Sequence, residues 1–345
     1  MKIFLLTISI LSVQLAVFAQ RNEPEDYYVS AYNEMSDMLA GRDSLSIKRA
    51  VFLAEWAYSE GILDYKAAFS DEINRIVKFI GLFYETNNLS SYRTGKQMAL
   101  NEYFFRPYSG NQYEPYTYDF ESFSLDFKGP WERQFVSEVL KTHKGQCRSL
   151  PWMYKILADE IGANVSLAYA PRHCYIMYKD DDNLTPEDWI NLELTTQQMQ
   201  PAWWIKKDFG ICDNAVKAGT YMTPLTDTQT VACQMSDLAL GYREKFDRYD
   251  EFTFCCASRS LEFYPMNPNA WIIRGKSLEQ MLQGHLTRTQ DTIDEYALHL
   301  LYLMEDAKLH LKSSYMTEET EEMLERRKEQ AFEAQKHANE NYLQK

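Results

Sequence analysis

The residues best suited to chemistry lie in three short segments, at 144–151, 171–173 and 189–195. The first segment reads Lys-Gly-Gln-Cys-Arg-Ser-Leu-Pro and contains Cys147, a candidate nucleophile. A cysteine nucleophile needs a lowered pKa, a base within hydrogen-bond reach and a third group that orients the base. The second segment supplies His173, and the third supplies Asn191 and Glu193. Together these residue types predict covalent catalysis by a thiolate.

Cys147 is expected where a loop meets the start of a helix. Proline fits an α-helix only in its first turn, so Pro151 places that start within a residue or two. The N-terminus of a helix favours the thiolate form of a cysteine. Gly145 gives the backbone room for a tight turn against a substrate. The alternative role for Cys147 is a disulfide with Cys174.

His173 opens a predicted strand and is the expected base. The alternative base is His143, only four residues before Cys147. In the third segment, Asn191 and Glu193 lie on one face of a predicted strand because side chains alternate along a strand. A carboxylate or an amide in that place can hold the imidazole in its productive tautomer.

The groups that would contact a substrate are less sharply marked. The backbone N–H of Cys147 is a candidate oxyanion donor, and the side chain of Gln146 is a second candidate. Arg172 is a candidate for binding a substrate carboxylate. No Cys-x-x-Cys pair occurs, so a zinc cluster has little support, and the predicted chemistry requires neither a metal nor an organic cofactor.

The hydrophobic pattern predicts the elements around these segments. Apolar residues at helical spacing indicate helices over 44–60, from about 70, and on both sides of 143–146. Strands are predicted over 165–170, 173–179 and 189–195, with an acidic turn between the last two. Helices followed by antiparallel strands indicate an α+β fold. Residues 20–43 predict a loosely attached arm, and the Tyr-rich stretch 86–130 predicts an irregular loop or an aromatic groove.

After about residue 237 the chain is predicted to be all helical. Leu240-Gly241 and Gly275 stand 34 residues apart, and Pro265 precedes Trp271 by six. This resembles the tetratricopeptide repeat, whose helical pairs carry Leu-Gly in the first helix and a proline after the second. We expect a tetratricopeptide-like region over 236–315, which could contact a protein partner, and a charged, solvated helical tail over 316–345.

The three segments also resemble a known family. The matching residues are Gly145-x-Cys147, the strand residue His173, and Trp189-x-x-x-Glu193-x-Thr195, which resemble the core of the transglutaminase-like superfamily. The resemblance implies a papain-like core over 131–235, in which the cysteine heads a helix packed on an antiparallel sheet. It implies Cys147 as nucleophile and His173 as base. By its spacing from the tryptophan, Glu193 takes the place of the family's Asp, and Asn191 is the alternative third member.

Composition and the first residues limit the function further. The chain has 36 Lys+Arg against 50 Asp+Glu, a net charge of −14, which argues against binding nucleic acid or an anionic membrane. Lys2 and an apolar run before Gln20 predict a cleaved secretory signal over 1–19, with a single membrane anchor as the alternative. We therefore expect a periplasmic or secreted chain without a membrane span, in which 20–130 form a helical, Tyr-rich lead-in.

The function predicted from this resemblance is acyl transfer from an amide of a peptide or protein. Hydrolysis, as by a peptidase or amidase, is favoured over transfer to an amine because water is abundant. A core of this kind joined to tetratricopeptide-like helices is familiar among exported proteins of Gram-negative bacteria. The alternative is a catalytically inactive module of the same build that binds a protein or glycan partner.

Overall fold

A computed structural model of the chain describes residues 23–120, 129–317 and 320–343. Contacts divide the chain into two compact units that interleave along the sequence. One unit joins Met1–Leu63 to Asp227–Met316, and the other joins Asp64–Thr226 to Thr317–Lys345. Each segment predicted from the sequence was one continuous stretch, whereas each of these units joins two separate stretches. The predicted signal at 1–19 lies outside the described residues.

The second unit holds the three candidate segments and combines helices with small sheets, in agreement with the predicted α+β class. Its α-helices are α4 (Asp71–Thr86), α5 (Gly95–Phe105), α6 (Val136–Thr142), α7 (Ser149–Ile161), α8 (Ala202–Asp208), α9 (Asp213–Ala218) and α14 (Glu321–Leu343), and a π-helix spans Lys66–Ser70. Short 3-10 turns span Leu89–Ser91, Ser109–Asn111 and Trp131–Gln134. Its strands are β1 (Thr117–Tyr118), β2 (Lys144–Gly145), β3 (Ser166–Ala170), β4 (His173–Lys179), β5 (Trp189–Glu193) and β6 (Gln198–Gln200).

The main sheet is an antiparallel meander in the order β3-β4-β5-β6. Strands β3 to β5 fall on the three predicted segments, which were marked by apolar, β-branched and aromatic residues. Strand β6 was not predicted, because it has only three residues and its side chains are mostly exposed. Strands β1 and β2 form a separate parallel pair, also unpredicted, because two residues are too short to show a periodicity.

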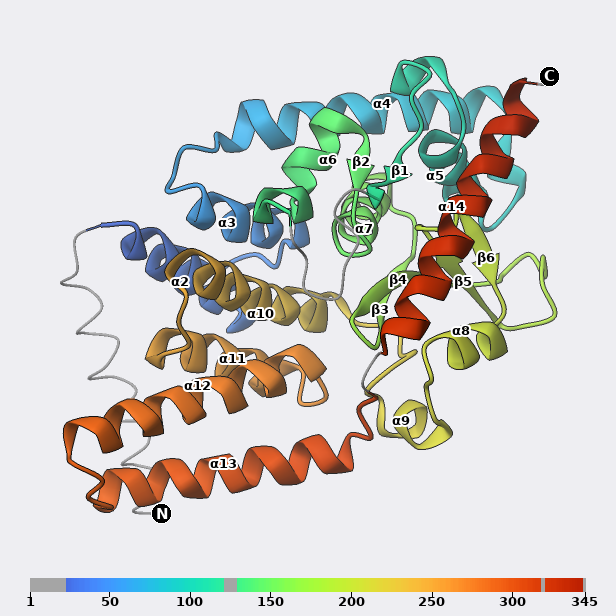
Figure 1. Cartoon of the computed structure of the whole chain (residues 1–345). Coiled ribbons are helices and arrows are strands. Elements are labelled where there is room, and N and C mark those ends of the chain that lie inside the picture. The colour runs from blue at the N-terminus through green and yellow to red at the C-terminus, as the bar shows by residue number, and fades with distance from the viewer. Residues whose placement is uncertain (1–22, 121–128, 318–319, 344–345) are drawn as a thin grey trace. The chain divides into compact units, whose positions relative to one another are not determined.

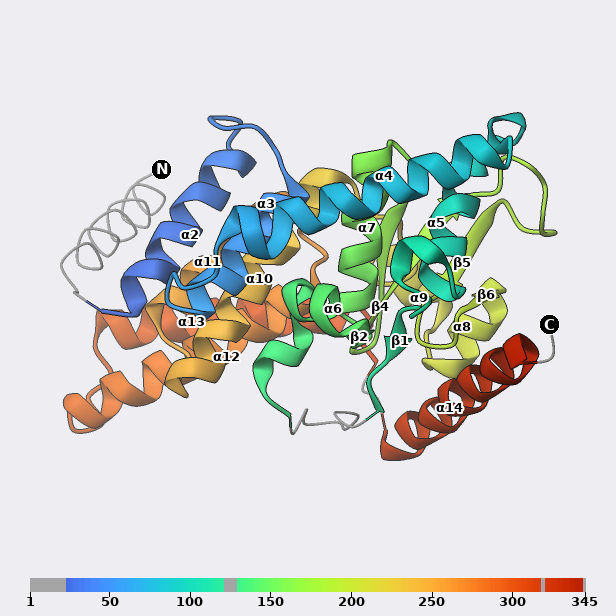
Figure 2. The ribbon, with the colours of Figure 1, turned by 90° about the horizontal axis from the view of Figure 1, so that it is seen from above.

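Helix α7 is the buried helix of this unit. Its residues 149–158 are all buried, and it contacts β3 and β4 as well as α4, α5 and α6. Figures 1 and 2 show it among these elements. A helix that is apolar on every side requires such enclosure. The helix ends at Gly162, whose φ of 67° provides the left-handed cap that the sequence predicted.

The described part of the Tyr-rich stretch, 86–120 and 129–130, is more ordered than the predicted loop, and 121–128 lie outside the described residues. Helix α5 occupies part of it, and the rings of Tyr103, Phe104, Tyr116 and Tyr118 are buried. Phe104 lies between Tyr116 and Tyr154, with ring centroids 4.8 Å and 5.2 Å away. These aromatics therefore fill the core of the unit and do not line an open groove.

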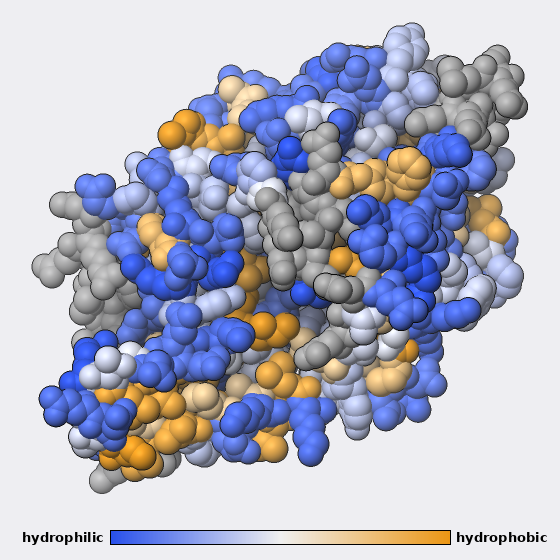
Figure 3. Space-filling view, viewed as in Figure 1, coloured by the Kyte–Doolittle hydropathy of each residue, from blue (hydrophilic) through white to orange (hydrophobic). Residues whose placement is uncertain are grey.

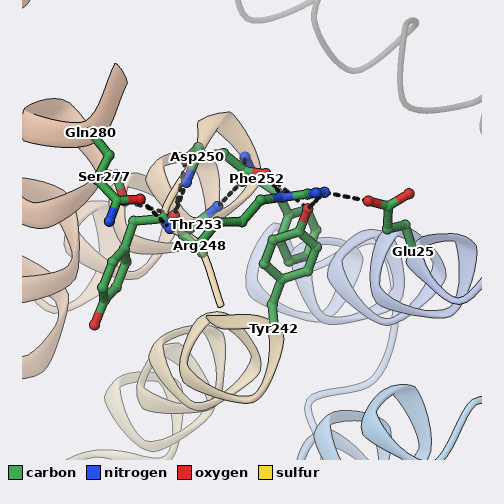
Figure 4. A network of polar contacts seen from close by, with 9 residues as sticks. Glu25, Tyr242, Arg248, Asp250, Phe252, Thr253, Ser277 and Gln280 are labelled. Atoms are coloured by element: carbon green, nitrogen blue, oxygen red, sulfur yellow. Dashed lines mark hydrogen bonds and ion pairs between the residues drawn. The ribbon is translucent and has the colours of Figure 1, made fainter. Parts of the chain in front are cut away.

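The other unit is helical. It contains α2 (Glu25–Leu39), α3 (Ile47–Tyr58), α10 (Asp227–Phe246), α11 (Glu251–Phe263), α12 (Pro268–Arg288) and α13 (Glu295–Ser313). The prediction of a loose arm over 20–43 was wrong, because α2 inserts Tyr28 against Tyr242 and Phe252. Figure 4 shows the polar contacts beside this cluster, where Arg248 pairs with Glu25 and with Asp250. These contacts attach the N-terminal helices to residues far along the chain.

Helices α10 to α13 follow one another in the chain, and each contacts the next (Figure 1). This part of the chain is helical, as the sequence predicted. Pro265 lies between α11 and α12, and its carbonyl oxygen accepts a hydrogen bond from Trp271 Nε1 at 2.7 Å. Helix α13 leaves several apolar side chains exposed, and apolar residues gather on that part of the surface (Figure 3). Across the described ranges, no helix is both long and apolar enough to cross a membrane.

Candidate active site

Strands β4 and β5 bring His173 and Glu193 together. In their antiparallel pairing, Met177 lies opposite Asn191 and Ile176 opposite Leu192. Continued toward the start of β4, this register places His173 and Glu193 on the same face of the sheet. His173 Nε2 lies 2.6 Å from Glu193 Oε2, and both side chains are buried. The predicted base and third group therefore form a short, enclosed hydrogen bond.

Thr195 completes the environment of the Glu193 carboxylate. Its backbone N–H and its hydroxyl both donate to Glu193 Oε1, at 3.0 Å and 2.7 Å. With His173 on Oε2, both carboxylate oxygens are satisfied. A buried carboxylate is stable only with such partners. Burial by itself would raise the pKa of Glu193, but the charge of His173 and these hydrogen bonds outweigh it and lower the pKa.

Cys147 lies two residues before α7, at the junction that the sequence predicted. The Gln146 backbone N–H donates to the Ser149 hydroxyl at 2.9 Å, which fixes the turn into the helix. The Cys147 side chain is partly exposed, and its Sγ lies 4.0 Å from the Arg172 carbonyl oxygen. Arg172 occupies the two-residue turn between β3 and β4, with a φ of 51°. The turn that presents His173 thus also contacts the thiol.

The thiol and the imidazole influence each other directly. Burial by itself would raise the pKa of the Cys147 thiol, but its hydrogen bond with His173 and the positive charges of His173 and Arg327 lower it. Burial by itself would lower the pKa of His173, yet Glu193 and Cys147 raise it to about 9. Because His173 Nε2 faces Glu193, Nδ1 is the nitrogen left for Cys147. These opposite shifts favour a thiolate–imidazolium pair near neutral pH.

Gly145 has a role that differs from the predicted one. Its backbone lies in β2, paired with Tyr118, and it is not in the left-handed region. A Cβ at this position would lie 2.8 Å from Leu150 Cγ and 2.8 Å from Val139 Cγ2. Glycine is therefore needed for close packing of the strand against α6 and α7, two residues before Cys147.

Comparisons with protein-family models, with curated proteins and with solved structures found no match to this chain. The geometry of the site itself therefore carries the functional argument.

Three residues that the sequence offered as alternatives lie outside the group formed by Cys147, His173 and Glu193. The amide nitrogen of Asn191 donates to the Gln200 carbonyl oxygen at 3.3 Å, so the observed partner of His173 is Glu193. His143 stacks on Tyr116 with centroids 4.5 Å apart and caps the end of α6. Cys174 is buried, and no disulfide joins it to Cys147.

The two candidate substrate-binding side chains differ in exposure. Gln146 is buried, and its Nε2 donates to the Asp119 carbonyl oxygen at 2.9 Å, which leaves one of its two amide hydrogens for other use. The Arg172 side chain is exposed beside the site. Within the part of the chain that the structure describes, no group of three His, Cys, Asp or Glu residues is placed to hold a metal ion.

Sequence reasoning missed four residues around the pair. Thr195 was noted only as part of a motif, although it orients Glu193. The Phe209 ring lies against the His173 ring, with centroids 4.7 Å apart. The charge of the helix residue Arg327 lowers the pKa of Cys147, and the buried Tyr118 lies close enough for Cys147 to raise its pKa. Of the four, only Thr195 gave a signal in the sequence, through its place in the motif with Trp189 and Glu193.

Proposed function

We propose that this chain is a cysteine enzyme that acts on amide bonds by acyl transfer, with Cys147 as nucleophile, His173 as base and Glu193 as the orienting group. The observation that carries the proposal is the buried 2.6 Å bond between His173 and Glu193 beside a partly exposed cysteine at a helix start. Nucleophile, base and orienting group in this order are what thiolate catalysis requires.

The reaction follows from these positions. The Cys147 thiolate attacks the amide carbonyl carbon, and a carbon–sulfur bond forms. The carbon–nitrogen bond then breaks, and the imidazolium of His173 gives its proton to the leaving amine. In the second half, His173 takes a proton from water, the resulting hydroxide attacks the thioester, and the thiolate leaves. Glu193 stays ionised throughout and stabilises the imidazolium, as its lowered pKa favours.

The finer assignment is part of the same proposal. A buried helix headed by the cysteine and packed on an antiparallel sheet supports a papain-like core of the transglutaminase-like kind. The consecutive helices α10 to α13, with Pro265 between α11 and α12, support a tetratricopeptide-like region. We also propose export to the periplasm or beyond on the basis of residues 1–19, and hydrolysis as the main outcome because water is the abundant acceptor.

Selective alkylation tests the proposal. The folded, reduced protein is treated with iodoacetamide at about pH 6, where an ordinary cysteine is mostly protonated, and adducts are mapped by mass spectrometry. Cys212 is exposed and serves as an internal reference thiol. We expect Cys147 to react much faster than Cys212, and we expect His173→Ala to remove this preference. If Cys147 reacts no faster than Cys212, the enzyme proposal fails and a binding role becomes the better interpretation.

A second measurement distinguishes hydrolysis, in which water accepts the acyl group, from transfer to an amine. A mixture of peptides is incubated with the wild type and with Cys147→Ala, with and without a primary amine such as glycine ethyl ester. Products that depend on Cys147 and carry the amine indicate transfer, whereas products with a free carboxyl group indicate hydrolysis. We expect mainly the free carboxyl products.

A further inference from the structure

Helix α14 belongs to the same compact unit as the candidate site. Figures 1 and 2 show it on the side of this unit where β1 and α8 lie. The sequence predicted a solvated tail, but Ala331 is buried and Phe332 contacts Phe120 with ring centroids 5.8 Å apart. One side of the helix therefore packs on the core, and this raises the question of what it contributes there.

Helix α14 is attached at the C-terminal end of α8 and at the residues just after it. Arg326 Nε donates to Asp208 Oδ1 at 3.1 Å, and its terminal nitrogen donates to the Asp208 carbonyl oxygen at 3.0 Å. Ahead of the helix, the Thr317 hydroxyl donates to the Gly210 carbonyl oxygen at 3.2 Å. Asp208 and Gly210 flank Phe209, so these contacts hold the two sides of that residue.

Phe209 connects the helix to the imidazole. The Arg327 guanidinium lies over the Phe209 ring, 4.3 Å from its centroid, and the same ring lies against His173 with centroids 4.7 Å apart. Phe209 is almost fully buried, with 1% of its surface exposed. A planar guanidinium packs well on an aromatic ring, and the pair gains stability when it is shielded from water. The result is a continuous series of contacts from α14 to the candidate base.

Arg327 also brings a positive charge to the site. It acts on the Cys147 thiol, Glu193, Asp208 and the buried Tyr118, and it favours the ionised form of each acidic group. The charged groups that act on Cys147 are His173 from β4, Glu193 from β5 and Arg327 from α14, and the thiolate in turn raises the pKa of Tyr118 in β1. Of these, His173 and Arg327 favour the thiolate, whereas Glu193 opposes it.

We propose that α14 is an integral part of the active site and that Arg327 is a positioning residue for the Cys147–His173 pair. This inference rests on the proposed function, because it assumes that the pair is the reactive centre. Arg327 has two separable effects. Its planar group holds Phe209 against the imidazole, and its charge stabilises the thiolate over the thiol.

The test compares the pH dependence of Cys147 alkylation, and of thiolate ultraviolet absorbance, between the wild type and three variants. Arg327→Gln removes the charge, and we expect the midpoint to rise by about one pH unit, the low end of the effect of a nearby opposite charge. Arg327→Lys keeps the charge, so the midpoint should stay close to that of the wild type. Lys336→Gln removes an exposed charge from the same helix and should change nothing.

Phe209→Leu separates the second effect. It removes the ring contact with His173 without altering any charge, so we expect a several-fold lower alkylation rate at the plateau with a smaller shift of the midpoint. Circular dichroism and the thermal unfolding midpoint of each variant establish that it is folded.

The outcomes keep the two proposals apart. If wild-type Cys147 already titrates as an ordinary thiol, the proposed function is wrong. If the pH midpoint of Cys147 alkylation is low in the wild type and equally low in folded Arg327→Gln, only the proposed role of Arg327 is wrong. A faster reaction in Arg327→Gln would also overturn the inference, because it would show that α14 obstructs the thiol. If Arg327→Gln does not fold, a raised midpoint in folded Arg327→Lys overturns the charge effect and an unchanged one supports it.

Discussion

Replacing Glu193 with Gln removes a buried charge with almost no change in side-chain shape. In the native site, Oε2 faces the Nε2 of His173 at 2.6 Å, and Oε1 accepts two hydrogen bonds from Thr195. An amide has one oxygen and one NH2 group, so it cannot accept at both ends. If the NH2 group faces Thr195, it meets the backbone N–H and hydroxyl of that residue, which are also donors, and the hydrogen bonds are lost. If it faces His173, the imidazole must accept at Nε2 and carry its proton on Nδ1.

The second arrangement prevents His173 from taking the thiol proton, because Nε2 is occupied by Glu193 and Nδ1 is the nitrogen left for Cys147. The pKa of Cys147 should then return toward the ordinary cysteine value of about 8.5, at which only about 0.3% is thiolate at pH 6. A wild-type site that is mostly thiolate at that pH would lose alkylation rate by about two orders of magnitude. Loss of the charged, buried hydrogen bonds should lower the free energy of unfolding by about 2 kcal/mol.

The assay is the rate of iodoacetamide labelling of Cys147 at about pH 6, with stability measured by urea denaturation. Glu102→Gln is the matched control, because Glu102 pairs with Arg106 at the surface and its loss should affect neither measurement much. A Glu193→Gln protein that is folded and alkylates at the wild-type rate would refute the orienting role of Glu193. It would also remove the basis for the low thiol pKa.

Three further predictions concern the same unit. Thr195→Val removes one hydrogen bond to Glu193 and should cost about 1–3 kcal/mol in the free energy of unfolding, measured by urea denaturation. Gly145→Ala places a Cβ 2.8 Å from Leu150 Cγ, so it should cost about 1–3 kcal/mol and slow Cys147 alkylation. The pKa of His173 is raised from 6.5 to about 9, so its imidazolium stabilises the fold fully below 6.5 and loses this contribution as the pH rises through 9. The stability difference between the wild type and His173→Gln should therefore shrink over that range, and a constant difference would contradict the shift.

Much of the candidate site could be predicted because its parts are close in sequence. Pro151 marked the start of α7, and the strand of His173 follows after only a short hairpin. The next strand returns alongside it, so Glu193 is brought back to the same face by local pairing alone. Alternation along the strand left both Asn191 and Glu193 as candidates, and the resemblance to the transglutaminase-like core selected Glu193.

The rest of the site depends on contacts that leave no local pattern. Phe209 is one of many aromatic residues, and its contact with His173 depends on where α8 ends. Arg327 lies in a helix rich in charges of both signs, where the residues that face the core look like those that face water. Tyr28 was similarly placed in a loose arm, because its partner Tyr242 lies over two hundred positions later. Contacts between residues far apart in the sequence determine the positions of all three side chains.

The register of the sheet explains why a glutamate at position 193 reaches His173. The printed pairing ends at Ile176 and Leu192, and one further step places Glu193 opposite Tyr175. His173 is therefore the diagonal neighbour of Glu193 on the same face, whereas Thr195 lies in the turn after β5. Directly opposed Cβ atoms on a sheet are about 5 Å apart, and diagonal ones about 7 Å. Relative to aspartate, the extra methylene of Glu193 spans this diagonal, and Thr195 holds the second carboxylate oxygen from the turn. An aspartate at 193 would leave the carboxylate short of the imidazole unless the strand shifted, so the longer side chain and Thr195 act as one unit.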